Sequence, residues 1–156
     1  MKFEKVTRDE ASAYYSIVDR KKVECTGGAW EMPTRSTEGS AGYDFHSPYD
    51  VIIKPGKSVR FPLLVRVKDM PKDVVLLMFN RSGMSLTGGI RLDNAVGVID
   101  SDYDRSIWFQ ATNHGRRAYR IKTNDKILQG VFMRYEKVDD DKASGERAGG
   151  LGSTGK

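Results

Sequence analysis

The sequence predicts an all-β fold, a sandwich or a barrel built from short strands. Short apolar runs recur at spacings of roughly 8–12 residues from residue 51 onward, as they do in such folds. Glycine is frequent, with 16 in 156 residues, and occurs in short clusters rather than in a repeat. That distribution is typical of a turn-rich β protein. The length suits one domain with a buried core.

The N-terminal part is expected to differ from the rest. Residues 3–6 predict a short strand, and residues 7–22 predict a helix. Thr7 can cap that helix, with Glu10 at the capping-box position, and apolar side chains recur after it at helical spacing. The pair Gly27-Gly28 ends the region. We interpret residues 7–28 as a short helical insertion on the surface.

The strands follow in order from Val51. Residues 51–53, the Pro55-Gly56 turn and residues 58–67 predict a hairpin. Residues 74–79 predict a buried strand, and residues 107–112 and 127–135 predict two more. The last 18 residues, 139–156, are charged and then glycine-rich. Because they offer almost nothing to bury, we expect them to be a flexible tail.

The net charge of +5 is concentrated in residues 39–136, which hold 15 basic and 10 acidic side chains. That balance suits an anionic ligand. The chain has no long Lys/Arg block and no basic stripe interleaved with aromatic residues, so no nucleic-acid partner is expected.

Cysteine usage and hydropathy indicate a cytoplasmic protein with no membrane partner. Cys25 is the single cysteine, which excludes an intrachain disulfide and favours a reducing compartment. The first residues alternate charged and apolar side chains and lack the apolar core of a signal peptide. The longest apolar run, residues 74–79, is too short to span a bilayer.

The segment Gly97–Tyr103 is the strongest candidate for chemistry. An apolar triplet that reads as a strand end runs into Asp100, followed by Asp102 and an aromatic ring. A strand holds its last side chain rigidly, and rigid placement within hydrogen-bond reach is what a general base needs. The alternative is a polar hairpin turn, since Asp and Ser are common turn residues.

Four more segments interrupt the strand pattern with residues of functional type. Each taken alone also fits a turn or a linker. They are Ser40–Asp44, which places a carboxylate after a small-residue turn; Arg81–Gly83, which offers a cation, a hydroxyl and a backbone N–H; Asp125–Gln129, which leads into a strand; and the tail Arg147–Lys156.

In order and spacing, these five segments resemble the trimeric dUTPase family. The similarity covers about Pro33 to Lys156 and rests on the phrases PTRSTEGSAGYD, RSG, GVIDSDY and GGLGSTGK. The resemblance implies a distorted jelly-roll β-barrel over residues 1–138, with residues 139–156 as a tail that closes over the active site. It also implies a homotrimer with active sites shared between subunits. The implied reaction is hydrolysis of dUTP to dUMP and pyrophosphate, with Mg²⁺ bridging the phosphates.

The resemblance also implies a role for individual residues near the nucleoside and the metal. Asp100 is then the base that activates water for attack on the α-phosphorus, and Asp44 holds Mg²⁺ through water. Tyr103 packs beneath the deoxyribose. Asn94 reads the uracil edge, assisted by backbone groups at Val98 and Ile99.

Two further groups are implied around the phosphates. Arg81, Ser82 and the N–H of Gly83 bind phosphate oxygens, with Gln129 on the α-phosphate side. From the tail, Arg147, Ser153 and Thr154 close over the γ-phosphate, Leu151 takes the position that covers the uracil, and Gly152 is a further substrate-binding residue.

The chain departs from the family pattern at four places. Leu151 stands where the tail usually has a stacking aromatic residue, and the spacing between Arg147 and the glycine pair is one residue shorter. After Tyr103 the chain has Asp104-Arg105, where the family typically has Arg-Gly or a close variant. Residues 7–28 look like an insertion relative to compact members.

Two alternatives to a dUTP pyrophosphatase stay open. A dCTP deaminase relative would carry a Glu general base ten residues after the Asp, where this chain has Gln110. The other alternative is a regulatory binding protein that uses the nucleotide-closed tail as a switch for an unknown partner protein. The insertion and Leu151 are the features that favour it.

Overall fold

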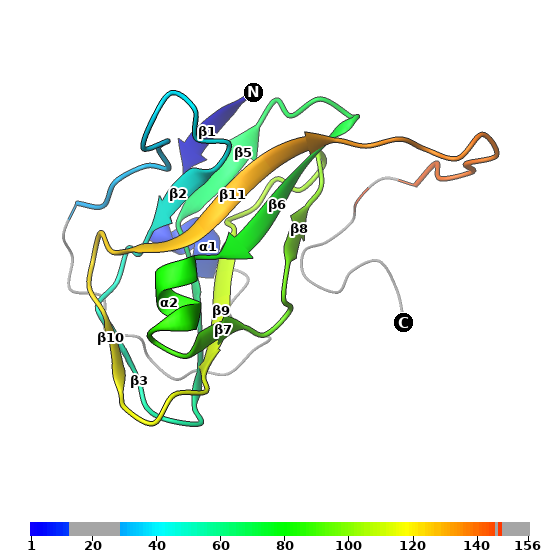
Figure 1. Ribbon diagram of the computed structural model, residues 1–156. Coiled ribbons are helices and arrows are strands. Elements are labelled where there is room, and N and C mark those ends of the chain that lie inside the picture. Colours follow the sequence, from blue (N-terminus) through cyan, green and yellow to red (C-terminus); the bar gives the residue numbers. More distant parts are fainter. Residues whose placement is uncertain (13–28, 146, 148–156) are drawn as a thin grey trace.

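Four antiparallel sheets surround one apolar core in the computed structural model, which describes residues 1–12, 29–145 and 147 (Figure 1). The largest sheet has the order β2 (Tyr43–His46), β11 (Lys126–Arg134), β6 (Val74–Asn80) and β8 (Gly97–Ile99). A three-stranded sheet has the order β4 (Ser58–Pro62), β9 (Trp108–Asn113) and β7 (Ile90–Leu92). Two-stranded sheets pair β1 (Lys2–Lys5) with β5 (Val65–Lys68) and β3 (Val51–Ile53) with β10 (Tyr119–Ile121). The short helices are α1 (Arg8–Ser12) and α2 (Ser82–Leu86).

The core follows from the alternation of side chains along the strands. In β6, Val74, Leu76 and Met78 are buried, and the residues between them are half-buried on the opposite face. Side chains from several sheets meet the inner face, and the largest of those that are fully buried include Phe45, Phe61, Phe109, Ile90, Ile121 and Leu128. The arrangement is the predicted all-β, jelly-roll-like barrel.

The N-terminal prediction is confirmed over the residues described. Residues 2–5 form β1, and α1 begins directly after Thr7. Thr7 N–H donates to Glu10 Oε2 at 3.0 Å, and Glu10 N–H donates to Thr7 Oγ1 at 3.2 Å, so the capping box is formed. The rest of the predicted helix, Gly27-Gly28 and Cys25 lie outside the described residues.

The predicted hairpin over residues 51–67 is wrong. β3 pairs with β10, while residues 58–67 divide into β4, which pairs with β9, and β5, which pairs with β1. The division falls at Leu63-Leu64, where Leu64 has a φ of 57° and both side chains are buried. The left-handed backbone at Leu64 lets the chain pass from one sheet to another, a change that an apolar run does not reveal.

The other predicted strands are confirmed, with bounds that differ by at most one residue: 74–79 as β6, 107–112 as β9 and 127–135 as β11. The sequence reading missed β2, β7, β10 and α2, each of five residues or fewer. Elements this short carry too few side chains to display a period.

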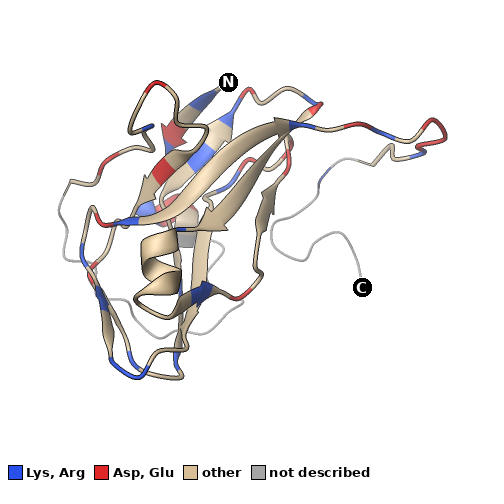
Figure 2. Ribbon diagram, in the orientation of Figure 1, with Lys and Arg blue, Asp and Glu red and all other residues tan. Residues whose placement is uncertain are grey.

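Positive charge gathers on the loops that join β3 to β4 and β9 to β10 (Figure 2). Lys54, Lys57, Arg116 and Arg117 are exposed there. Backbone hydrogen bonds from Gly56 N to Asn113 O (2.8 Å) and from Asn113 N to Lys57 O (3.0 Å) join the two loops. None of the described helices has the length and apolar character required to cross a membrane.

Gly130 is the tightest point in the largest sheet. A Cβ at this position would lie 2.6 Å from Phe45 Cε2 and 2.9 Å from Leu76 Cδ1. We therefore expect Gly130→Ala to lower the free energy of unfolding by about 1–3 kcal/mol, the usual cost of overpacking a core. Gly39→Ala is the matched control, since its Cβ would meet no atom within 4 Å. Equal urea midpoints for the two variants would contradict the packing described here.

Candidate functional site

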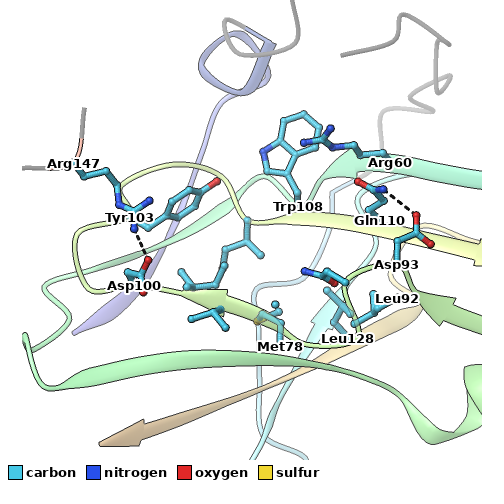
Figure 3. A pocket seen from close by; sticks show the side chains of 15 residues that line it. Arg60, Met78, Leu92, Asp93, Asp100, Tyr103, Trp108, Gln110, Leu128 and Arg147 are labelled. Carbon is cyan, nitrogen blue, oxygen red and sulfur yellow. Dashed lines mark hydrogen bonds and ion pairs between the residues drawn. The ribbon is translucent and has the colours of Figure 1, made fainter. Parts of the chain in front are cut away.

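A pocket of about 430 Å³ opens between β8, the turn after it and β9 (Figure 3). Its volume lies within the range of small-molecule sites. Its walls combine apolar side chains with a few polar groups that converge on the cavity. Five of the predicted site residues line it together with Arg147 of the tail segment: Asn94, Val98, Ile99, Asp100 and Tyr103.

Asp100 lies at the mouth of this pocket because of the register of β8. Ile99 pairs with Leu76 in the central strand β6, and Asp100 is the next residue along the chain. The Tyr103 N–H donates to the Asp100 carbonyl at 3.1 Å and closes a turn. The side chain of Asp100 is 52% exposed, so its carboxylate is accessible to water. Both conditions for a general base, a fixed backbone and an accessible oxygen, are present.

Tyr103 forms one wall of the pocket and is 8% exposed. Its hydroxyl donates to the Ser106 carbonyl at 2.9 Å, which fixes the plane of the ring. Burial raises the pKa of the Tyr103 hydroxyl, so the group stays neutral at physiological pH. The residue therefore offers a rigid aromatic surface and no charge.

Arg147 lies across the mouth of the pocket (Figure 3). Its guanidinium pairs with Asp100 and, through Nε at 2.8 Å, with Asp102, and it stands 5.8 Å from the centre of the Tyr103 ring. The hydrogen bond to Asp102, aided by the charge of Asp100, raises the pKa of Arg147. This one cation therefore offsets half of the charge of the two carboxylates.

Asn94 reaches the pocket from the turn between β7 and β8. The turn is tight, with Ala95 at a φ of 58° and Val96 N–H donating to the Asn94 carbonyl at 2.6 Å. Gly97, the first residue of β8, lies close to Met78 and to the Asn94 amide. A Cβ added at Gly97 would lie 3.1 Å from Met78 Cβ and 3.7 Å from Asn94 Nδ2. The amide is thus held beside the backbone of β8.

The sequence analysis did not predict that Arg60, Asp93, Trp108 and Gln110 form the far wall of the pocket. Gln110 Nε2 donates to Asp93 Oδ2 at 2.9 Å, and the Arg60 guanidinium lies 5.0 Å from the Trp108 ring centre. All four side chains line the cavity. Trp108 and Gln110 alternate with the buried Phe109 and Ala111, so a period-two reading of this strand could have placed both on the outward face.

A second group of predicted residues surrounds Asp44 and does not line the pocket. Asp44 is 5% exposed. Arg81 Nε lies 3.3 Å from Oδ1, while Lys126 Nζ and Ser36 Oγ lie 2.8 Å and 2.9 Å from Oδ2. Burial alone would raise the pKa of Asp44, but the hydrogen bonds from Lys126 and Ser36 and the charge of Arg81 outweigh it and lower the pKa. Lys126 and Ser36 had no assigned role in the sequence reading, because their contact with Asp44 depends on tertiary structure.

Ser82 and Gly83 begin α2, directly after Arg81. The first N–H groups of a helix have no intrahelical acceptor and can bind an anion. Gln129 lies opposite Asp44 in the pairing of β11 with β2, and its side chain packs under Gly42. The predicted phosphate-binding residues of the body of the chain therefore lie around Asp44, apart from the pocket that holds Asp100.

The donors present suit a metal ion that is bound mainly by a ligand's phosphates. Within the described part of the chain, no group of three or more His, Cys, Asp or Glu side chains is placed to hold a metal. Both oxygens of Asp44 already face cations or a hydroxyl. Mg²⁺ commonly keeps several waters and takes one or two carboxylates plus phosphates, so a metal here would depend mainly on the phosphates of a ligand and not on a protein cage.

The remaining predicted site residues, Leu151, Gly152, Ser153 and Thr154, lie outside the described residues.

The fold and the pocket define a small all-β barrel with a carboxylate at the mouth of a ligand-sized cavity. The model of the dUTPase family matches residues 28–155, so the chain belongs to the dUTPase family. It is 34% identical over 151 residues to the deoxyuridine 5'-triphosphate nucleotidohydrolase of Hydrogenovibrio crunogenus, covering 90% of this chain and 95% of the relative.

Two solved structures extend the comparison. The dUTPase from Streptococcus mutans is 26% identical with a TM-score of 0.68, covering 89% of this chain and 99% of that one. A mutant dUTPase from phage phi11 of S. aureus is described as revealing the coordination of a structural Mg(II) ion. It is 21% identical with a TM-score of 0.64, covering 74% and 91% of the two chains.

The environment of Asp44 leads to a pH-dependent prediction. A lowered folded pKa means that the carboxylate contributes stability above its ordinary pKa of 3.8, and that this contribution is lost as the pH falls through the lower, folded value. We expect Asp44→Asn to reduce the free energy of unfolding at pH 7 by about 1–3 kcal/mol, since two cations lose a buried partner. The gap to the wild type should begin to narrow below about pH 4 and should go on narrowing as the pH falls towards the lower, folded pKa.

The measurement is chemical denaturation from pH 3 to pH 8, with Asp69→Asn as the control because Asp69 is exposed and has no ion pair among the described residues. A gap that stays constant with pH would contradict the ion-pair account.

Proposed function

We propose that the protein is a dUTP diphosphatase, which hydrolyses dUTP to dUMP and pyrophosphate. The observation that carries the proposal is the position of Asp100, fixed by β8 at the mouth of a pocket lined by Asn94 and Tyr103. Membership of the dUTPase family and a relative named for this reaction support it.

In the proposed reaction Asp100 is the general base. It accepts a proton from a water molecule while the water oxygen attacks the α-phosphorus, and the bond from that phosphorus to the α,β-bridging oxygen breaks. Pyrophosphate leaves with the negative charge that develops on it, so most of the catalysis is positioning and charge stabilisation. Arg147 must leave Asp100 before this step, and a triphosphate offers its guanidinium a more highly charged partner.

The nucleoside binds in the pocket. In the proposal, the Asn94 amide and the backbone at Val98 and Ile99 read the uracil edge, while the rigid ring of Tyr103 packs beneath the deoxyribose. A ring held this closely leaves no room for a 2′-hydroxyl, which would exclude UTP.

The triphosphate binds to the cationic group around Asp44. Arg81, the hydroxyl of Ser82 and the N–H of Gly83 are the proposed phosphate donors, with Gln129 beside the α-phosphate. Mg²⁺, when bound, neutralises charge on the phosphates, and Asp44 is the residue proposed to orient its water ligands.

We propose that the complete site is assembled in a homotrimer. In one chain the group around Asp44 does not line the pocket that holds Asp100, so another copy can supply the missing half. The outer face of the largest sheet supports assembly between copies. Apolar side chains of neighbouring strands lie side by side on this face and are partly exposed to solvent. They are Val75, Leu77, Phe79, Val98, Val131 and Met133. Val98 is 59% exposed and Met133 is 49% exposed.

Residues 139–156 are the proposed closing tail of residues 1–138, with Leu151, Gly152, Ser153 and Thr154 acting over the nucleotide. The described part of this tail supports the proposal, since Arg147 already reaches the mouth of the pocket. A cytoplasmic location is part of the proposal and rests on the single cysteine.

Pyrophosphate release from dUTP, dCTP, dTTP and UTP, measured side by side, tests the function. We expect dUTP to be preferred by a factor of about 100 or more over dCTP, because cytosine would leave buried polar groups unpaired. UTP should also be a poor substrate, because the Tyr103 ring leaves no room for its 2′-hydroxyl. Asp100→Asn should reduce kcat at least about 1000-fold and still bind a non-hydrolysable dUTP analogue. Ammonia release from dCTP would instead support the deaminase alternative, and full activity of Asp100→Asn would remove Asp100 as the base.

Truncation after Ala143 tests the tail. The shortened chain lacks Arg147 and the proposed closing residues, so kcat/KM should fall by about 100-fold or more through lost charge stabilisation. Its thermal unfolding should match that of the full chain, because the removed residues add nothing to the described core. A rate equal to that of the full-length protein would contradict a closing role.

A further inference from the structure

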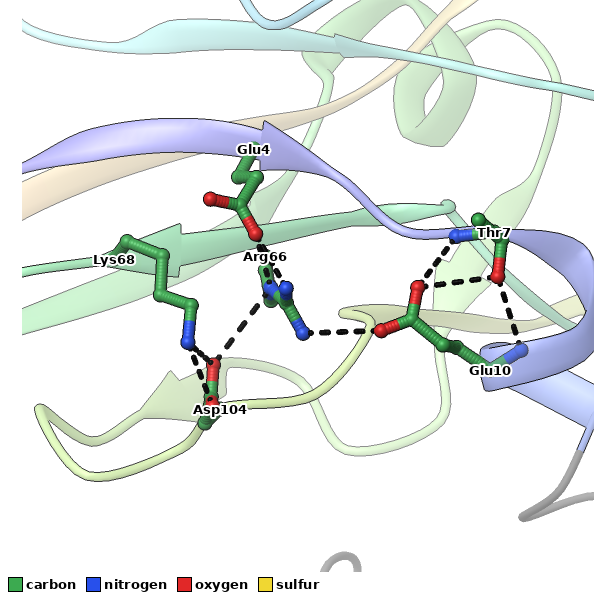
Figure 4. Close-up of polar contacts among 6 residues, drawn as sticks. All are labelled: Glu4, Thr7, Glu10, Arg66, Lys68 and Asp104. Atoms are coloured by element: carbon green, nitrogen blue, oxygen red, sulfur yellow. Dashed lines mark hydrogen bonds and ion pairs between the residues drawn. The ribbon is translucent and has the colours of Figure 1, made fainter.

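An ionic network fastens the N-terminal segment to the barrel (Figure 4). Arg66 of β5 lies directly opposite Glu4 of β1 in the strand register, and its guanidinium pairs with that carboxylate. The same guanidinium lies 3.4 Å from Glu10 Oε1 in α1. The second oxygen of Glu10 accepts the N–H and hydroxyl of Thr7, so the capping box holds the carboxylate in place.

Asp104 joins the network from the opposite side. Lys68 Nζ lies 2.6 Å from Asp104 Oδ1, and Arg66 Nε lies 3.7 Å from the same oxygen. The turn that carries Asp100 ends at Tyr103, and Asp104 is the next residue. Arg66 and Lys68 of β5 therefore hold the chain at the end of this turn. The start of that turn is held by the pairing of β8 with β6.

Asp104 directly follows Tyr103 in the sequence. Its partner Arg66 also contacts Glu4 and Glu10, which lie before residue 28, where the match to the family model begins. Arg66 therefore connects the N-terminal residues to the end of the turn that carries Asp100.

We propose that Asp104 is a positioning residue for Asp100. Arg66, which contacts Glu4 of β1 and Glu10 of α1 as well as Asp104, couples the position of these N-terminal elements to the position of the turn that carries this base. The proposal rests on the proposed function. A half-exposed ion pair adds little to global stability, because solvent screens it. Catalysis is more demanding, since a base displaced by about 1 Å can lose on the order of 100-fold in rate. Loss of Asp104 should thus affect kcat more than folding or nucleotide binding.

The test uses the full-length protein and four variants: Asp104→Asn, Asp104→Glu, Glu10→Gln and the double variant of Asp104→Asn with Glu10→Gln. We expect Asp104→Asn to lower kcat for dUTP about 10-fold or more, with KM within about twofold and an unchanged unfolding midpoint. Asp104→Glu should restore most of the rate. Glu10→Gln should have a smaller effect that is not additive with Asp104→Asn, because both carboxylates act on Arg66.

Asp73→Asn is the matched control. It removes another exposed carboxylate, the partner of Arg134, and should leave kcat unchanged. A wild-type kcat for Asp104→Asn, or an equal loss in Asp73→Asn, would overturn the proposal, as would a loss of rate that follows a loss of stability.

Hydrogen exchange gives a readout that does not require turnover. In the chain without nucleotide, the backbone amides of residues 100–105 should exchange faster in Asp104→Asn than in the wild type or Asp73→Asn. Unchanged exchange would also overturn the proposal. If the wild-type protein fails to hydrolyse dUTP but the amides of Asp104→Asn still exchange faster, the proposed function is wrong and the role of Asp104 in holding the turn is supported.

Discussion

The pairing of β8 with β6 is the constraint on which the candidate site depends. Three residues of β8 pair with the central strand of the largest sheet, and the register at Ile99 determines where Asp100 leaves the sheet. Gly97 permits the close approach of Met78 and Asn94 at the other end of the strand. A shift of one residue would exchange the two faces of β8 and direct Asp100 away from the pocket.

The candidate site has two parts, and each contains a carboxylate in a different electrostatic environment. Asp44 is buried among cations, and its low pKa keeps the carboxylate charged. Asp100 is exposed and is neutralised by Arg147, a residue far along the chain. In the proposed function, a polyphosphate would compete for the cation that is paired with each carboxylate, so nucleotide binding would rearrange charge pairs that already exist.

Much of this could be predicted from the sequence. β6, β9 and β11 are long enough to display a pattern, and the run from Gly97 to Tyr103 combines a strand end with two carboxylates. The hairpin over residues 51–67 was wrong because β3 and β4 find their partners, β10 and β9, more than 40 residues away. Local alternation contains no information about such pairings. For the same reason, neither the contact of Lys126 with Asp44 nor the meeting of Arg66 with Asp104 was foreseeable.

The two faces of the short strand β8 have different contacts. Ile99 lies on the same face as the buried Leu76, while the exposed side chain of Val98 belongs to the apolar face proposed for the contact between copies, and both residues also line the cavity. Assembly and chemistry then share one strand of three residues. An enzyme built in this way would lose activity on dilution even while each separate barrel stayed folded.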